Sequence, residues 1–535
     1  MTGRLSLKVI NSIKGCRNKI MDKTLSKNDN RLSKPELIIL LLSAVITITF
    51  VSTSSPLFPY NPWDDTNVFF TVGRAIKHGL VPYKDIFDHK GPLLYFIYAL
   101  ATLVSERSFI GVWIIECVAA SVFSVYSWKI AKLFTVPSKF SIVLMPLFLG
   151  VVYTCKMFNF GGNTEELCFP LLTVVLYLVL KAIVVSDGLP GKKEALICGI
   201  ISSALFWLKY TFLGFMIGVC LYILCLSVKR KSFARLWSLI WRFLAGFMIV
   251  TIPLLFYYFV NDALGYLWEA YFYDNIFLYY RDTETIAIFS IPVIKNIAIP
   301  IHSIFASIVM FPSFGVMLFF TLLSMVFIGK EHRKKTFILF FMTLALSAGF
   351  IFTRRIFIYY YAYILYYCFG FALIPFIRLW NKAEAVFKDN RSFIRGLLSF
   401  SLIVVFALTI FLGKNKYLIF QPKTFLAQYR MAETINQTPD AKVLTYDVMD
   451  AGFYTAAGIM PCNRYCADKM FGDSYPQLRE EQDRLISEGY FDYIVTSYFC
   501  EAEWDNYEMI QEEAIPYIDF TGEEILDAYK LYKRI

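Results

Sequence analysis

The chain has 535 residues, of which 57% are hydrophobic and 18% are charged. Soluble globular chains are about 45–50% apolar and about 25% charged. This composition therefore excludes a soluble globular protein, a disordered chain, a collagen and a small disulfide scaffold. The aromatic share of 18% is typical of lipid-facing helices and of the belts at membrane interfaces. We expect a membrane protein that contacts membrane lipids.

The net charge of +10 is unevenly distributed along the chain. Residues 424–535 hold 9 Lys+Arg against 21 Asp+Glu, a balance of −12, so residues 1–423 carry +22. The basic residues of the apolar part lie mostly in short loops, where they indicate membrane topology rather than nucleic-acid binding. No nucleic-acid partner is expected.

The chain starts with a basic arm, residues 1–36, which contains nine Lys or Arg and lacks the layout of a cleaved signal peptide. We expect this arm in the cytoplasm. The following apolar stretch, 37–58, is long enough to cross about 30 Å of hydrocarbon. The N-terminus is then inside, and residue 59 lies on the outer side of the cell membrane.

Residues 59–108 form a long outer loop with an amphipathic stretch at 67–78 and an apolar stretch at 92–104. The second stretch has roughly 13 residues, too few for a membrane span, so we expect an interfacial or re-entrant helix. Loop charge supports this interpretation. If the stretch crossed, every later basic loop would lie outside, against the usual charge bias.

Ten further apolar stretches are expected to span, giving about eleven spans in total and an outer C-terminus. They lie at 109–131, 139–157, 167–185, 195–208, 211–227, 236–260, 304–329, 336–352, 356–377 and 396–412. The weakest of these, 195–208, is interpreted as one arm of a bent hairpin with 211–227 around Lys209. The expected fold class is mainly α, a polytopic membrane helical bundle.

A polar linker, 413–423, separates the bundle from residues 424–535, whose composition is that of a soluble domain. Strands alternating with helices predict a small extracytoplasmic α/β domain there. The expected strands are 442–446, 464–467 and 493–497, with a helix at 476–488. A disulfide or a metal site among Cys462, Cys466 and Cys500 is left open.

The outer loop 59–108 gathers ionisable residues at the membrane surface. They are Asp64, Asp65, Asp85, Asp88, His89 and Lys90. A carboxylate there can act as a general base or bind a cation, and a neighbouring Lys or His can neutralise a phosphate. The alternative interpretation is an ordinary solvated loop with Pro and Gly turns.

Three motifs in this loop carry a resemblance: D-x-x-V-F from Asp65, then Gly73-Arg74, then P-Y-x-D-x-F-D-H-K-G-P-L from Pro82. Together they resemble the first external loop of bacterial GT-C membrane glycosyltransferases, relatives of lipid A aminoarabinose transferases and protein O-mannosyltransferases. The second outer loop, Gly161-Gly-Asn-Thr-Glu-Glu166, is similar to the same branch. The resemblance covers a GT-C-like transmembrane domain, 37–412, and more loosely the outer domain.

The resemblance implies sugar transfer by direct displacement from a polyprenyl-phosphate donor to an envelope glycan, lipid or protein acceptor, with inversion. The chemistry needs one base and positive charge at the leaving phosphate. Asp65 is the base candidate because it heads the motif, and Asp64 is the alternate. The candidates for the donor phosphate are Lys90, His89, Lys209, Arg354 and Arg355, and those for substrate are Asp88, Asp85, Glu165 and Glu166. No cofactor is assigned, and a divalent cation at the paired aspartates is left open.

Two departures from the family pattern stand out. Lys90 is followed by Gly91-Pro92, where relatives have Pro-Pro before an interfacial helix. Relatives also often carry a His in a late span where this chain has Tyr359. The role of that His is therefore in doubt here.

Two other functions remain open, a transporter or flippase of polyprenyl-linked glycans and a non-catalytic scaffold for envelope assembly. A transporter would more often show charged residues within spans and repeated interrupted helices. Here the charges gather in outer loops and no repeat is visible, which favours the enzyme. Purely structural roles also remain open. Lys209 would then extend its charged end to the membrane interface, and Glu165 and Glu166 would interact with the helix dipole.

Overall fold

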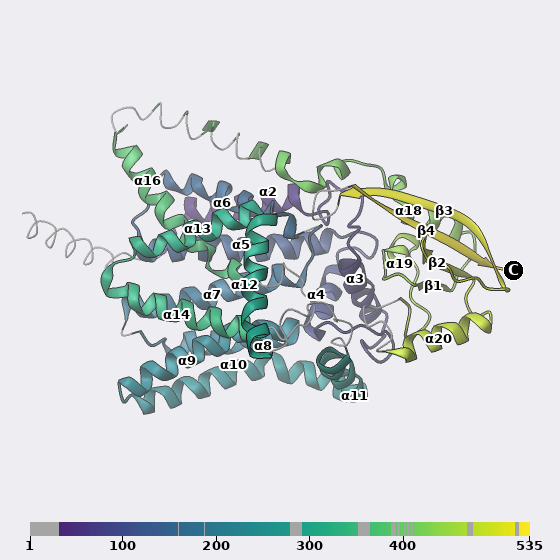
Figure 1. The fold of residues 1–535 in the computed structure, drawn as a ribbon, viewed down its shortest axis with the longest axis horizontal. Coiled ribbons are helices and arrows are strands. Elements are labelled where there is room, and N and C mark those ends of the chain that lie inside the picture. Colours follow the sequence, from purple (N-terminus) through teal and green to yellow (C-terminus); the bar gives the residue numbers. More distant parts are fainter. Residues whose placement is uncertain are drawn as a thin grey trace, which may run out of the picture.

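The computed structural model describes residues 31–535 except 159, 187, 279–291, 351–363, 468–474, 519–523 and most of 387–409. Most of the basic arm, together with Arg354, Arg355 and Tyr359, lies outside the described residues. Figure 1 shows the helices gathered in one bundle and the four strands at the end that carries the C-terminus.

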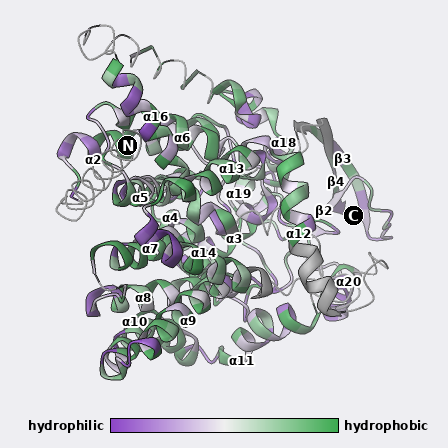
Figure 2. Cartoon of the chain, turned by 60° about the vertical axis from the view of Figure 1, so that its left-hand side comes forward, coloured by the Kyte–Doolittle hydropathy of each residue, from purple (hydrophilic) through white to green (hydrophobic). Residues whose placement is uncertain are grey.

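Five helical stretches of the described part are long and apolar enough to cross a membrane, or six if one bent pair counts as a span. They are α2 (Lys34–Val51), α5 (Ile110–Phe134), α7 (Thr164–Val185), the stretch Lys192–Lys229 and α10 (Phe233–Val260). Figure 2 shows that hydrophobic residues dominate these helices. A multi-pass membrane fold is therefore supported, but the predicted number of eleven spans is not confirmed.

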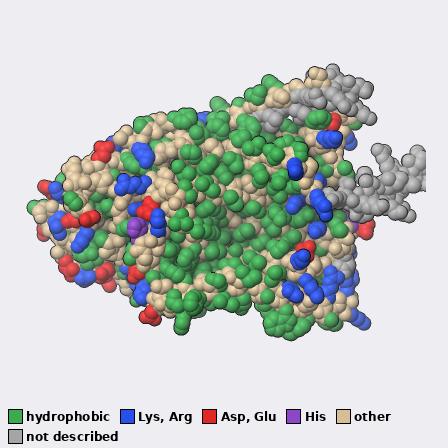
Figure 3. Space-filling model, turned by 180° about the vertical axis from the view of Figure 1, so that it is seen from behind, with side chains coloured by type: hydrophobic (Ala, Val, Ile, Leu, Met, Phe, Trp, Pro, Cys, Tyr) green, Lys and Arg blue, Asp and Glu red, His purple; other side chains and the backbone are tan. Residues whose placement is uncertain are grey.

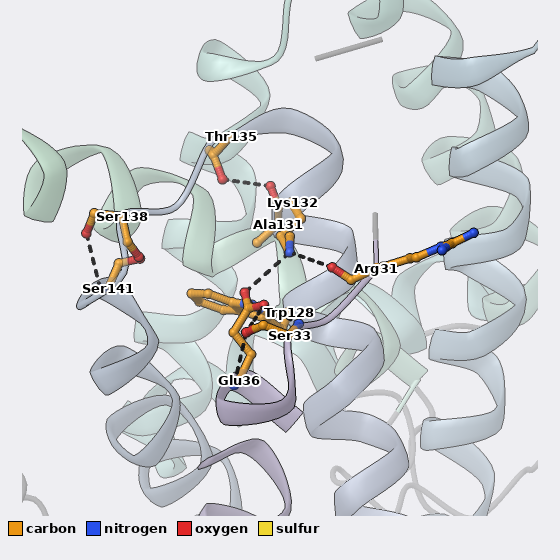
Figure 4. A network of polar contacts seen from close by, with 9 residues as sticks. All are labelled: Arg31, Ser33, Glu36, Trp128, Ala131, Lys132, Thr135, Ser138 and Ser141. Carbon is orange, nitrogen blue, oxygen red and sulfur yellow. Dashed lines mark hydrogen bonds and ion pairs between the residues drawn. The ribbon is translucent and has the colours of Figure 1, made fainter. Parts of the chain in front are cut away.

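The first span is anchored at its start by polar contacts to α5. Ser33 and Glu36 form a capping box at the start of α2. Glu36 also accepts hydrogen bonds from Trp128 Nε1 at 3.1 Å and from Lys132 Nζ at 3.3 Å, as Figure 4 shows. These contacts join α2 to the far end of α5, so the two helices run antiparallel.

The predicted hairpin around Lys209 is confirmed. Lys209 has extended backbone angles, φ −162° and ψ 95°, between α8 (Lys192–Lys209) and α9 (Leu213–Lys229). Gly246 of α10 touches Leu196, and Thr251 bonds Ser203, so α8 and α10 run parallel. The intervening α9 must therefore return in the opposite direction.

The predicted span at 304–329 is broken rather than continuous. The chain forms α12 (Pro292–Met310) and α13 (Pro312–Phe327), bent by 118° at Phe311. A residue before proline is sterically disfavoured in the helical region, and Phe311 accordingly has φ −126° and ψ 80°. Further elements of the bundle are α6 (Leu144–Tyr153), α14 (Lys330–Phe350), the 3₁₀ helix η5 (Ile364–Ala372) and α16 (Leu373–Val386).

Both helices expected in the first outer loop are present. The amphipathic one is α3 (Asp64–Lys77), which begins three residues earlier than predicted, and the apolar one is α4 (Pro92–Thr102). With 11 residues, α4 is too short to cross the membrane. The two helices touch where α3 has Gly73, because a Cβ there would lie 2.7 Å from the backbone of Tyr98. Figure 1 shows α3 and α4 between the bundle and the sheet.

The C-terminal region has the expected α/β character, with a four-stranded sheet in the order β1-β2-β4-β3. Its strands are β1 (Val443–Tyr446), β2 (Tyr493–Ser497), β3 (Tyr507–Ile518) and β4 (Glu524–Arg534), and its helices are α18 (Ala427–Ile435), α19 (Phe453–Ala457) and α20 (Pro476–Ser487). Strand β1 pairs with β2 in parallel, and the other two pairings are antiparallel.

The strand predicted at 464–467 is wrong. The segment is irregular, although Cys466 O accepts the backbone N–H of Thr445 in β1 at 3.2 Å. Its apolar residues are buried by this edge contact rather than by a sheet ladder. The prediction also missed β3 and β4, because their acidic residues and Pro516 are poor strand formers. Cys462 and Cys500 are free thiols in this structure.

The C-terminal region is bonded to the first outer loop through buried polar contacts. Arg74 of α3 is 2% exposed and donates to the carbonyls of Tyr454 at 3.1 Å and Ile459 at 3.0 Å. Thr71, one turn earlier, donates to Asp450. A buried guanidinium needs such partners, so the orientation of α3 depends on the C-terminal region.

Candidate active site

Two ion pairs meet at the end of the bundle that faces the C-terminal sheet. Asp65 Oδ1 lies 3.6 Å from Lys90 Nζ, and Glu165 Oε1 lies 2.5 Å from Lys209 Nζ. The charge of Lys90 also acts on Glu165, so the two pairs are neighbours. Four residues that are far apart in the chain therefore form one cluster of alternating charge, the four-residue cluster.

Three members of the four-residue cluster sit at the ends of helices, and the fourth lies just before one. Asp65 is in the first turn of α3, Glu165 is in the first turn of α7, and Lys209 ends α8. Lys90 precedes α4 by two residues. Carboxylates at helix N-termini and a cation at a C-terminus are the placements that the helix dipole favours. Local helix signals thus placed the charges, and packing brought them together.

Gly91 explains how Lys90 reaches the end of α8. A Cβ on Gly91 would lie 2.2 Å from Trp207 O and 2.3 Å from Leu208 O. No side chain fits at this contact, and a proline ring would not fit either. The departure from the Pro-Pro pattern of relatives therefore has a local cause, because this chain packs its loop backbone directly on α8.

The other charged residues of the loop are held within it or by its neighbours. Asp85 accepts the backbone N–H of Val81 at 2.7 Å, and Asp88 accepts the Tyr95 hydroxyl at 2.6 Å. The ring of His89 is buried, with Nδ1 3.5 Å from Asp88. These contacts fix the shape of the turn that carries Lys90. Roles of these three residues in binding substrate or phosphate stay predictions.

Glu165 and Glu166 are adjacent but have different partners. Whereas Glu165 pairs with Lys209, Glu166 is 3% exposed and lies against Glu116 of α5, which is 2% exposed. The sequence interpretation missed Glu116, although a glutamate inside an otherwise apolar span is itself a signal of a functional residue.

A second polar cluster lies where the first loop, the C-terminal region and the π-helix η4 (Trp268–Leu278) meet. Glu269 of η4 accepts from the Tyr475 hydroxyl at 3.2 Å and lies 3.8 Å from Arg464 Nη2. The carboxyl of Asp274 is fully buried, and neither of its oxygens has a hydrogen-bond partner among the described residues. Burial and then the charge of Glu269 raise the pKa of Asp274 to about 7, against the opposing effect of Arg464.

The π-helix η4 also contacts the turn that carries Lys90. Asn275 Nδ2 donates to the carbonyl of His89 at 2.6 Å. This bond links the junction cluster, defined as Glu269, Asp274 and Arg464, to the four-residue cluster. The sequence interpretation did not single out the junction cluster. Its acidic members are isolated within an aromatic stretch, and π-helices of this kind are often found at functional sites.

The described residues contain no group of three or more His, Cys, Asp or Glu that could hold a metal ion. At the paired aspartates, the ammonium group of Lys90 lies 3.6 Å from Asp65. The cation hypothesis for Asp64 and Asp65 therefore has no further ligand to support it in the described part of the chain.

No protein-family model matches the chain, and no curated protein matches its sequence significantly. Solved structures do match its fold. ArnT from Cupriavidus metallidurans bound to undecaprenyl phosphate aligns with a TM-score of 0.56 at 11% identity, over 93% of this chain and 98% of that one. ArnT in the apo state aligns with a TM-score of 0.55 at 11% identity, over 92% and 97%.

The fold of the chain is thus similar to that of ArnT over most of its length. The resemblance inferred from the first-loop motifs is therefore supported at the level of the fold.

The close contact at Gly91 makes a testable prediction. In Gly91→Ala the added methyl group would meet two backbone oxygens that cannot rotate away, so we expect destabilisation by about 1–3 kcal/mol, a typical cost of overpacking. The measurement is thermal unfolding of the purified protein in detergent. Gly265→Ala is the matched control, because a Cβ at Gly265 meets nothing within 4 Å. Equal stability of the two variants would contradict the packing argument.

Proposed function

We propose that the chain is an integral membrane glycosyltransferase that moves a sugar from a polyprenyl-phosphate donor to an envelope acceptor on the outer side of the membrane. The observation that carries the proposal is the four-residue cluster at the end of a fold shared with ArnT bound to undecaprenyl phosphate. The cluster contains both a carboxylate suited to be a base and cations suited to a leaving phosphate.

The proposed reaction is a single displacement. Asp65 takes the proton of the acceptor hydroxyl, whose oxygen bonds to the anomeric carbon of the donor sugar. The bond between that carbon and the phosphate oxygen breaks, and its electron pair leaves with the lipid phosphate. The configuration at the anomeric carbon inverts, because attack and departure occur on opposite faces.

The two lysines have different proposed roles. The contact of Lys209 with Glu165 is 2.5 Å long, whereas that of Lys90 with Asp65 is 3.6 Å. A charge-assisted hydrogen bond is strong at the shorter distance and weak at the longer one. We therefore assign Lys90 to the donor phosphate and Lys209 to holding Glu165 in place. His89 precedes Lys90 and is buried. We propose that it lies near the same phosphate and does not bind it directly.

The base assignment is tested with Asp65→Asn and Asp64→Asn in purified protein supplied with labelled polyprenyl-phosphate sugar. An amide keeps the size of the side chain but does not accept the proton, so we expect Asp65→Asn to lower transfer about 10²-fold or more, with donor binding retained. If Asp64→Asn abolishes transfer and Asp65→Asn does not, Asp64 is the general base. Normal turnover in both variants rejects the mechanism, and movement of intact lipid between leaflets without transfer favours the flippase.

The orientation of the protein is proposed from its charge distribution. Figure 3 shows Lys and Arg gathered at one end of an apolar band, whereas at the opposite end Asp and Glu are mixed with Lys and Arg. Since cytoplasmic ends carry excess Lys and Arg, we propose that the basic end is inside and the C-terminal sheet outside.

Cysteine labelling of intact cells tests this orientation. His78 and Glu331 are suitable sites, because both residues are themselves exposed. His78 follows α3 and Glu331 is at the start of α14, at opposite ends of the bundle in Figure 1. A membrane-impermeant reagent is expected to label His78→Cys and not Glu331→Cys, each compared with the parent protein. The reverse pattern would overturn the assignment.

We propose that the C-terminal region guides the acceptor. Its balance of −12 disfavours contact with an anionic lipid phosphate. The junction cluster instead combines buried carboxyl oxygens with an Arg464 guanidinium that lies against the rings of Phe87, Tyr266 and Tyr465. Such a set can accept and donate hydrogen bonds to a hydroxyl-bearing acceptor.

Arg464→Gln separates the acceptor from the donor step. We expect transfer to fall about 10-fold or more, while slow hydrolysis of the donor by water continues at the wild-type rate. The matched control is Arg484→Gln on the exposed face of α20, where the arginine pairs with Glu481 and Glu488. If Arg464→Gln and Arg484→Gln transfer equally well, the junction cluster has no part in acceptor binding.

A further inference from the structure

Glu116 and Glu166 form a buried carboxyl pair beside the four-residue cluster. Glu116 Oε1 accepts the backbone N–H of Gly162 at 2.7 Å, and its two oxygens lie 3.0 and 2.8 Å from Ser52 Oγ. Glu166 Oε2 lies 3.3 Å from the same N–H, and its Oε1 lies 3.3 Å from Asn163 Nδ2. The two carboxyl groups thus face the same N–H donor, so they lie next to each other.

Two ionised carboxylates cannot stabilise each other in this position, because each can only accept hydrogen bonds and both are buried against one donor. Two buried carboxylates at this separation would also repel each other strongly. Among the described residues, Tyr98 of α4, Tyr153 of α6 and Cys117 of α5 lie close enough to be affected by the charge of the pair, and groups of these types are ordinarily neutral at pH 7. The pair therefore holds one proton and one negative charge.

The pair supports the turn formed by Gly161 and Gly162. Both glycines have positive φ, +88° and +83°, a conformation that other residues rarely adopt. The carbonyl of Gly161 accepts from Thr66 Oγ1 at 3.1 Å, and that of Gly162 accepts from Tyr98 at 2.5 Å. A Cβ on Gly162 would lie 2.7 Å from Thr66 Oγ1, so the turn touches the first turn of α3 directly.

This turn connects the pair to the proposed catalytic residues from two sides. Thr66 is the residue after Asp65, and Glu165 comes three residues after Gly162 in the chain. Any displacement of the Gly162 N–H therefore moves both Asp65 and Glu165. Neither carboxyl of the pair belongs to the four-residue cluster, so the pair acts through the backbone.

We propose that Glu116 and Glu166 share one proton and serve as positioning residues, holding the Gly161–Gly162 turn and through it Asp65 and Glu165. The role in transfer rests on the proposed function, whereas the shared proton does not. Loss of that proton at alkaline pH places two like charges in contact and weakens the anchor of the turn. Transfer is then expected to fall on the alkaline side of its pH profile.

The shared proton is tested by infrared spectroscopy of the purified protein at pH 7. An isolated glutamic acid has a pKa of about 4.3 and is ionised at this pH, so a protonated-carboxyl C=O band reports an unusual group. We expect the difference spectra of wild type against Glu116→Gln and against Glu166→Gln to show the loss of one such band. Glu165→Gln is the matched control and keeps the band, because Glu165 is ionised beside Lys209. If neither Gln variant changes the band region, the proposal is wrong.

The positioning role is tested by the pH profile of kcat for transfer. In Glu166→Gln an amide replaces the protonated acid and donates to Glu116, so we expect the alkaline fall of the wild type to disappear. Glu166→Ala lacks this donor, and we expect at least about 10-fold lower kcat than for Glu166→Gln at pH 7, with the KM for donor little changed. An alkaline fall in Glu166→Gln identical to that of the wild type would overturn the positioning role.

The two measurements separate the possible failures. If the wild type neither transfers sugar nor hydrolyses donor, the proposed function fails, and the infrared spectra still decide whether the pair shares a proton. If transfer occurs but no band is lost, the inference fails and the proposed function stands. Should Glu166→Ala not fold, the comparison of Glu166→Gln with wild type remains decisive.

Discussion

The cost of placing charge next to an apolar bundle is the constraint on which the outer end of this protein depends. A charged side chain in such surroundings is expensive unless it has a partner. Lys209 ends an otherwise apolar hairpin, and Glu165 begins an apolar span, so each has to be matched. Their 2.5 Å pair joins α7 to α8, and the Asp65–Lys90 pair joins the first loop to the same place. The charges that suit the proposed chemistry are thus also the contacts that hold four segments together.

Close backbone packing fixes the positions of the charged residues in the cluster. Gly91 lies directly on the last carbonyls of α8, and Gly162 lies against the first turn of α3. At both contacts a side chain would push the neighbouring charged residue away from the cluster. Hydrogen bonds fix α3 as well. Arg74 donates to two carbonyls of the C-terminal region, which leaves little freedom in the orientation of the helix. The C-terminal region is therefore part of the architecture of the site and not only an appended module.

The comparison between prediction and structure shows where hydropathy stops being informative. It located the five stretches that are long and apolar enough to span, and loop length with charge correctly kept 92–104 from being a span. It did not reveal the 118° bend at Phe311, because a broken helix pair is as apolar as a straight one. In the C-terminal region, β3 and β4 stay hidden because their acidic residues contradict strand propensity, and only pairing with each other and with β2 stabilises them.

The sequence by itself determined the class of the molecule and the local part of its site. Asp65 and Lys90 could be named because each stands in a short motif within one loop, and motifs are local. The tertiary structure alone decided that Glu116 meets Glu166, because their contact joins two spans that are 50 residues apart. It also decided that Arg464 meets Glu269, which lies 195 residues earlier in the chain. Such contacts depend on how helices pack against one another, and no spacing within the chain encodes that geometry.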